Sequence, residues 1–105
     1  MKKEIRNRFR KEVFTRDKNT CKGCNKKFDE SDLDAHHITD RNEIPNGGYC
    51  KENGITLCKE VCHIKAEKFH MTGGKEWEEG FHPDDLYEKI DSSKGKAFYF
   101  SQLLG

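Results

Sequence analysis

Two pairs of cysteines constrain the fold of this chain more than any other feature. Cys21 and Cys24 form a C-x-x-C motif, and Cys58 and Cys62 form a C-x-x-x-C motif further along the chain. One tetrahedral zinc ion commonly joins two such pairs. Because four thiolates leave no open position for water, the predicted ion is a structural zinc. The sequence therefore predicts that both segments meet at one metal ion.

The composition makes such a staple necessary. Only 32% of the 105 residues are hydrophobic and 37% are charged, so the apolar core of this single small domain is thin. Disulfides or a redox pair are the alternatives, but the odd count of five cysteines favours a metal site. Cys50 is then the spare cysteine, which we expect to be a small buried residue.

No apolar run opens the sequence, which passes from Met1 directly into a charged segment. This pattern predicts neither a secretory signal nor a membrane span. We therefore expect a cytoplasmic, intracellular protein with no membrane partner. In a reducing compartment the cysteine thiols stay available for a metal ion.

The charge is unevenly distributed, although the net charge is only +1. Residues 1–27 contain eleven Lys and Arg against three acidic residues, whereas acidic residues outnumber basic ones in both 28–71 and 72–105. A basic segment suits a polyanion such as DNA, and an ordinary solvated face is the alternative.

Helical spacing of apolar residues predicts an amphipathic helix from Glu4 to about Asp17. Basic side chains occupy its other faces. The candidate DNA-binding residues on this helix are Arg6, Arg10, Lys11 and Arg16.

Two adjacent histidines, His36 and His37, are the main candidates for chemistry. They lie in a predicted strand over residues 34–39, and a return strand is predicted to begin at Tyr49–Glu52. Successive side chains of a strand point to opposite faces. One imidazole could then hold a metal ion while its neighbour acts on a water molecule.

A further candidate ligand set follows the second cysteine pair. The segment from Cys62 to about His70 is predicted to be a helix, on which His63 and Glu67 share one face because they are four residues apart. That face could present a metal ion to the histidine strand. An exposed Glu67 that pairs with a lysine is the alternative.

Six separated elements resemble the HNH endonucleases, in their cysteine-containing branch, over roughly residues 5–70. These elements are Val13-Phe14-Thr15-Arg16-Asp17, Cys21-x-x-Cys24, His36-His37-Ile38, Asn53, Leu57-Cys58 and Cys62-His63. Two departures are small. Three residues lie between the two cysteines of the second pair, where the family more often has two. Glu67 stands where many members have a further histidine.

The resemblance implies a small α+β fold: a ββα-metal (His-Me) finger stapled by the four-cysteine zinc site, with the basic helix in front. It implies a DNA endonuclease that leaves 3′-hydroxyl and 5′-phosphate ends, of a kind found in phages and mobile elements. His37 would activate the water, and Asn53 would orient its ring or brace the loop. His36 and His63 would hold a divalent cation, with Glu67 as a candidate third ligand. The cation would be Mg²⁺, Mn²⁺, Ni²⁺ or a second Zn²⁺.

The resemblance ends near residue 71, so the expected division is a nuclease domain at 1–71 and a C-terminal extension at 72–105. Pro83-Asp84-Asp85 is a good helix start, so the extension is expected to be mostly helical. Its apolar end is expected to pack on the finger, with a homodimer or a larger DNA-processing complex as the alternative.

A non-catalytic zinc module that binds DNA or a protein is the competing interpretation. Four cysteines and a basic helix satisfy it completely. It leaves the grouping of His36, His37 and His63 unexplained, because a purely structural module does not need these side chains.

Overall fold

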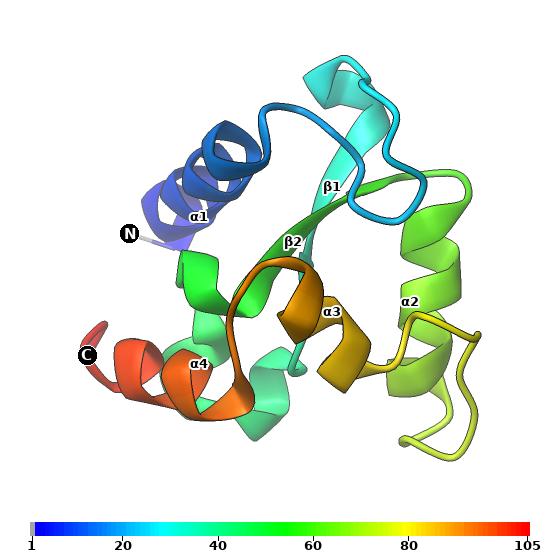
Figure 1. Ribbon diagram of the computed structural model, residues 1–105. Coiled ribbons are helices and arrows are strands. Elements are labelled where there is room, and N and C mark those ends of the chain that lie inside the picture. The colour runs from blue at the N-terminus through cyan, green and yellow to red at the C-terminus, as the bar shows by residue number, and fades with distance from the viewer. Residues whose placement is uncertain (1) are drawn as a thin grey trace.

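The computed structural model describes residues 2–105. Over these residues the chain forms one two-stranded sheet and four α-helices, joined by short 3-10 turns (Figure 1). The elements are α1 (Lys2–Asp17), β1 (Leu33–His37), β2 (Gly54–Cys58), α2 (Cys62–Met71), α3 (Pro83–Lys89) and α4 (Lys94–Gln102). The small α+β class and the N-terminal helix are confirmed. No helix in residues 2–105 is long and apolar enough to cross a membrane.

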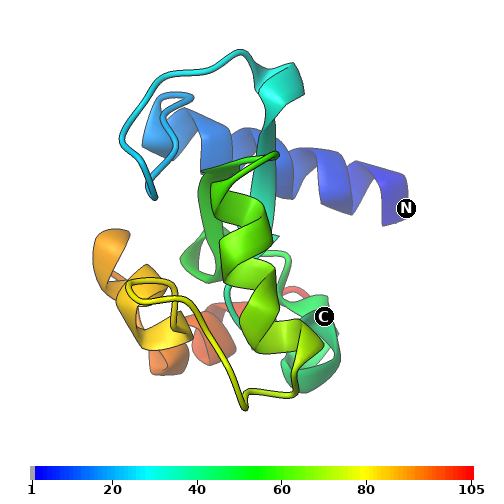
Figure 2. The same cartoon turned by 90° about the vertical axis from the view of Figure 1, so that its right-hand side faces the viewer.

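The sheet lies between two helices. β1 and β2 are antiparallel, with Leu33 opposite Cys58 and His37 opposite Gly54. Viewed from the side, α1 runs behind the two strands and α2 stands in front of them (Figure 2). β1, β2 and α2 follow one another in the chain and form the predicted ββα unit.

The core forms where α1 crosses the sheet. Phe9 and Val13 are buried one helical turn apart and pack with Ile55 and Leu57 of β2 in one apolar cluster. A Cβ atom on Gly54 would lie 2.5 Å from the Cγ2 atom of Val13, so only glycine lets the helix approach this strand so closely. This close contact fixes α1 beside β2 at Gly54, the residue that pairs with His37 of β1.

The return strand does not begin at Tyr49–Glu52, so that prediction is wrong. This segment enters a 3-10 turn at Lys51–Asn53, and the strand is Gly54–Cys58. Its carbonyl groups are already bonded elsewhere: Arg16 Nη1 donates to the Lys51 carbonyl at 2.6 Å and Ser92 Oγ to the Glu52 carbonyl at 2.8 Å. Side chains from α1 and from the C-terminal segment therefore bond to these carbonyl groups, in place of the backbone of a neighbouring strand.

The C-terminal segment packs beside the loop between the strands. Asn46 Nδ2 donates to the Ser101 carbonyl at 2.9 Å, and the Cys50 thiol lies 3.4 Å from the Ser101 hydroxyl. Cys50 is buried, as expected for the spare cysteine. The predicted helix start at Pro83 is confirmed, and the His82 ring caps α3 by accepting the Asp84 N–H at 3.1 Å.

Candidate metal sites and active-site cleft

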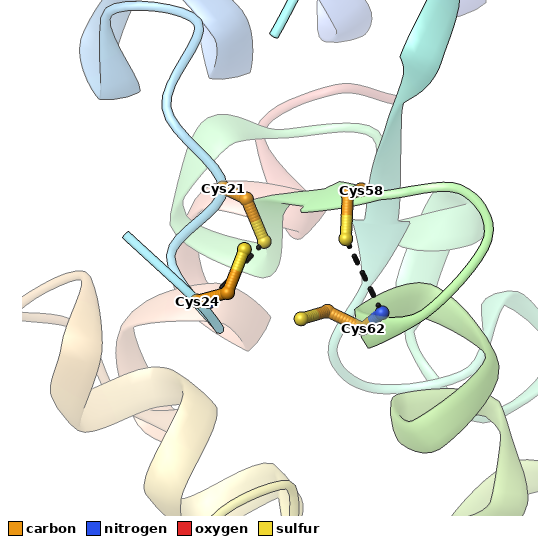
Figure 3. Close-up of side chains that lie close together, drawn as sticks. All are labelled: Cys21, Cys24, Cys58 and Cys62. Carbon is orange, nitrogen blue, oxygen red and sulfur yellow. Dashed lines mark hydrogen bonds between the residues drawn. The ribbon is translucent and has the colours of Figure 1, made fainter. Parts of the chain in front are cut away.

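The four paired cysteines converge on one point (Figure 3). Cys21 and Cys24 lie on the loop after α1, Cys58 ends β2 and Cys62 begins α2. Their Sγ atoms all lie within 4.8 Å of one another, and all four thiols are free of disulfides. The N–H groups of Cys24 and Cys62 point at the sulfurs of Cys21 and Cys58, at 3.5 and 3.4 Å. Such N–H groups stabilise negative sulfur.

The electrostatics of this cluster call for a positive ion. Burial raises the pKa of the Cys62 thiol, and the neighbouring Cys21 and Cys58 raise it further. Four thiolates at this spacing repel one another unless a cation lies between them. The donor set therefore fits a structural metal ion such as zinc, in agreement with the predicted tetrahedral site.

A second cluster joins β1 to α2. One ligand atom each from His36, His63 and Glu67 lies within 4.8 Å of the others. Glu67 Oε1 is 3.0 Å from His63 Nε2 and 3.6 Å from His36 Nδ1. His36 is only 1% exposed, and its Nδ1 atom finds no hydrogen-bond partner within residues 2–105. Because such unpartnered buried atoms are rare, this nitrogen fits the place of a metal ligand.

Asp34 fixes the orientation of one of these ligands. Its Oδ2 atom lies 2.7 Å from His63 Nδ1, which donates to it, while His63 Nε2 faces Glu67 in the cluster. Burial alone would lower the pKa of His63, but Glu67 and Asp34 outweigh burial and raise it. His36 and His63 lower the pKa of Glu67, which keeps that carboxylate charged and suited to a cation.

His37 points to the other side of β1, as predicted for adjacent strand residues. Its ring stacks on Phe9 at 4.5 Å between centroids and meets Tyr49 edge-on at 4.7 Å. Burial, reinforced by the charges of His36 and Arg41, lowers the pKa of His37 to about 4. The imidazole is therefore neutral at neutral pH, and its buried Nε2 atom has no partner among the described residues.

One cleft of about 450 Å³ collects both histidines and the charged groups around them. Arg6 and Arg10 line it from α1, as two of the four candidate DNA-binding residues. Lys11 is exposed but lies outside the cleft lining. Arg16 is also outside, and its guanidinium is bonded to Asp17 and to two backbone carbonyls. The structure thus brings two of the four basic residues to the histidines.

Asn53 is fully buried and lies among backbone groups of the loop. Its Oδ1 atom accepts the Thr39 N–H at 2.9 Å, and its Nδ2 atom donates to the carbonyls of Thr39 and Gly48 at 3.1 and 3.2 Å. These contacts join the chain just after His37 to the far side of the loop.

His70, Arg41 and Tyr49 also line the cleft and were not among the sequence candidates. His70 donates from Nε2 to the His37 carbonyl at 2.9 Å, with the His36 ring stacked 5.2 Å away. Its position two helical turns after His63 was the available signal. Arg41 Nη1 donates to the Tyr49 hydroxyl at 3.2 Å, and Tyr49 packs on His37. Nothing in the local sequence indicated this pair, because it forms only when the loop folds over β1.

The comparison with protein families gives one match: residues 21–69, just under half of the chain, match the model of the HNH endonucleases. Comparisons with curated proteins and with solved structures give no significant match. The matched segment contains the four cysteines, both strands, most of α2 and the cluster of His36, His63 and Glu67. Residues 21–69 of this chain therefore match the HNH endonuclease family model and contain four cysteines placed to hold a metal ion.

Proposed function

We propose that this protein is a metal-dependent DNA endonuclease that hydrolyses phosphodiester bonds. One observation carries the proposal: a neutral imidazole with an unpartnered nitrogen, that of His37, lines the same cleft as the group formed by His36, His63 and Glu67. Phosphodiester hydrolysis needs a base for water and positive charge for the phosphoryl oxygens, and one cleft offers a place for both.

In this mechanism His37 accepts the proton of the attacking water. Its ring is held between Phe9 and Tyr49, which leaves one orientation, and its neutral form at pH 7 is the one that accepts a proton. A bound phosphate adds negative charge near the ring, which raises the pKa of His37 and strengthens the base.

His36, His63 and Glu67 would hold the divalent cation, and Asp34 would keep His63 in the tautomer whose Nε2 faces it. When bound, a cation such as Mg²⁺, Mn²⁺, Ni²⁺ or Zn²⁺ supplies Lewis-acid polarisation of the phosphate and stabilises the leaving 3′ oxygen. The products would carry 3′-hydroxyl and 5′-phosphate ends.

The four-cysteine site would hold a zinc ion with a structural role. It joins the loop after α1 to the end of β2 and the start of α2. The start of α2 carries His63, one residue after Cys62. A zinc ion at this place would therefore fix the helix that supplies two residues of the catalytic cluster.

Arg6 and Arg10 would contact backbone phosphates of the DNA, with Lys11 on the same helix. Both arginines line the cleft, while Arg16 is held by Asp17 and by backbone carbonyls. The guanidiniums of Arg6 and Arg41 also lower the pKa of Tyr49 against the opposite effect of burial, so positive charge is concentrated at this end of the cleft. Such phosphate contacts are salt-sensitive and weakly sequence-specific.

Neutralising both arginines should weaken DNA binding and its salt dependence. In Arg6→Gln/Arg10→Gln the slope of log K against log salt should fall by about 2, because each phosphate contact contributes about 0.9. The measurement is fluorescence anisotropy with a duplex, without divalent cations. The charge-matched control is Lys94→Gln/Lys96→Gln on α4, away from the cleft, which should leave the slope unchanged. Equal slopes for wild type and the arginine variant would remove these residues from the interface.

The test of the proposed function is cleavage of supercoiled plasmid by the purified protein. After mild chelation, Mg²⁺, Mn²⁺, Ni²⁺ or Zn²⁺ is added back singly, and the protein is checked for folding by circular dichroism. We expect cleavage with at least one cation and none without, and product ends that ligase can join. A folded protein that binds DNA without cutting under every condition would favour the non-catalytic module instead.

A further inference from the structure

The C-terminal segment reaches the buried Asn53 through one side chain. Tyr87 lies on α3, outside the residues that match the family model, and is 3% exposed. Its hydroxyl donates to Asn53 Oδ1 at 2.7 Å and lies 2.6 Å from the Thr39 hydroxyl. Tyr87 does not line the active-site cleft, so its hydroxyl can act only through these partners.

The hydrogen bonds around Asn53 are complete only with Tyr87 present. A phenol has one proton, and since it goes to Asn53, the Thr39 hydroxyl must donate to the phenol oxygen. Asn53 then accepts two hydrogen bonds at Oδ1 and donates two from Nδ2, which uses its full capacity. A buried amide with every position bonded has a single orientation.

This network holds the chain immediately after the proposed base. β1 ends at His37, and the next residues leave the ladder. The Ile38 N–H donates to the Asn53 carbonyl at 2.9 Å, and both the N–H and the carbonyl of Thr39 bond to the Asn53 amide. The backbone on the C-terminal side of His37 is thus fixed by Asn53, and Asn53 is fixed in turn by Tyr87.

We propose that Tyr87 is a positioning residue of the active site, which holds His37 in place through Asn53 and Thr39. The extension at 72–105 would then contribute to the activity of the nuclease. This inference rests on the proposed function, because it assigns Tyr87 a role in that same reaction. It predicts an effect on turnover and not on DNA binding, since Arg6 and Arg10, the proposed phosphate contacts, lie on α1 at the cleft.

The test compares two conservative variants of the full chain. Tyr87→Phe removes the hydroxyl and keeps the ring, and Tyr99→Phe makes the same change at a side chain that is 59% exposed on α4. Per folded molecule, kcat of Tyr87→Phe should fall about tenfold with KM within about twofold, because small displacements of a reacting group are costly. Tyr99→Phe should match wild type in both constants.

A second readout does not depend on activity. In isotope-labelled protein, the NMR resonances of the His37 ring and of the Asn53 side-chain amide should move in Tyr87→Phe and stay in place in Tyr99→Phe. Wild-type kcat per folded molecule with unmoved His37 resonances would overturn the inference. If wild type itself cut no DNA, the proposed function would fail, and the His37 resonances alone would decide the positioning role.

If Tyr87→Phe does not fold, Thr39→Val tests the positioning role instead. It removes the hydroxyl that donates to the phenol and leaves α3 unchanged. A reduced kcat with unchanged KM would support the positioning role, and wild-type kcat with unmoved His37 resonances would overturn it.

Discussion

Cys58→Ser should unfold the protein, as should removal of the metal ion by a strong chelator. Structural zinc contributes about 10–16 kcal/mol of apparent binding free energy in small zinc domains, whereas whole domains are stable by only about 5–15 kcal/mol. Cys58 ends β2, and its sulfur also accepts the Cys62 N–H. Its loss would free both the loop that carries Cys21 and the start of α2.

The measurement combines zinc content with thermal melting followed by circular dichroism. Wild type should bind one tightly held zinc ion and melt cooperatively, and Cys58→Ser should lose the ion and the transition. The matched control is Cys50→Ser, since Cys50 is buried beside Ser101 outside the four-cysteine cluster. That variant should keep the zinc ion. A Cys58→Ser protein that melts like wild type without zinc would contradict the structural role.

Local patterns were sufficient to predict much of this architecture. The two cysteine motifs predicted that Cys21 and Cys58 meet. The spacing within each motif is typical of zinc ligands, and one tetrahedral zinc ion takes four of them. Adjacent histidines on a strand predicted opposite faces, and helical spacing placed His63 and Glu67 together. Each of these inferences needs only one element and its periodicity.

Features that depend on distant partners could not be read in the same way. The predicted strand at Tyr49–Glu52 fails because Arg16 and Ser92 take its carbonyl groups, and both lie far away in sequence. The charge pattern likewise could not show that the Arg16 guanidinium is bonded within the protein.

The side chains that orient the candidate site are the hardest to foresee. The Asp34–His63 pair spans 29 residues and the Tyr87–Asn53 pair spans 34. No local periodicity links residues so far apart, and an aspartate in a strand or a tyrosine in a helix has an ordinary structural interpretation. For Asp34, contact with a histidine's second nitrogen was one of the two sequence interpretations and a solvated acid was the other, and the folded arrangement shows that it meets His63. The contact of the Tyr87 hydroxyl with the buried Asn53 amide is seen only in the fold.

His37→Ala should abolish most of the cleavage and leave the fold intact. A positioned general base contributes about 10²–10⁴-fold to a rate. His36 and His63 belong to the cation cluster, and His70 donates from Nε2 to the His37 carbonyl. The ring packs on Phe9 and Tyr49 at the cleft surface, so its removal should lower stability only modestly.

Two controls separate lost chemistry from lost binding. His37→Ala should bind duplex DNA with wild-type affinity, because the arginines on α1 are unchanged. Added imidazole should restore part of the rate, since it supplies a neutral base to the space that the side chain left. A similar loss without rescue, together with weaker DNA binding, would indicate a binding role for His37.

The most direct measurement is the single-turnover rate at which folded, cation-saturated His37→Ala cuts a DNA duplex, relative to wild type. The account predicts a rate at least about a hundredfold lower than that of wild type, with partial recovery in imidazole. A folded, cation-loaded His37→Ala protein that cuts at the wild-type rate would contradict it.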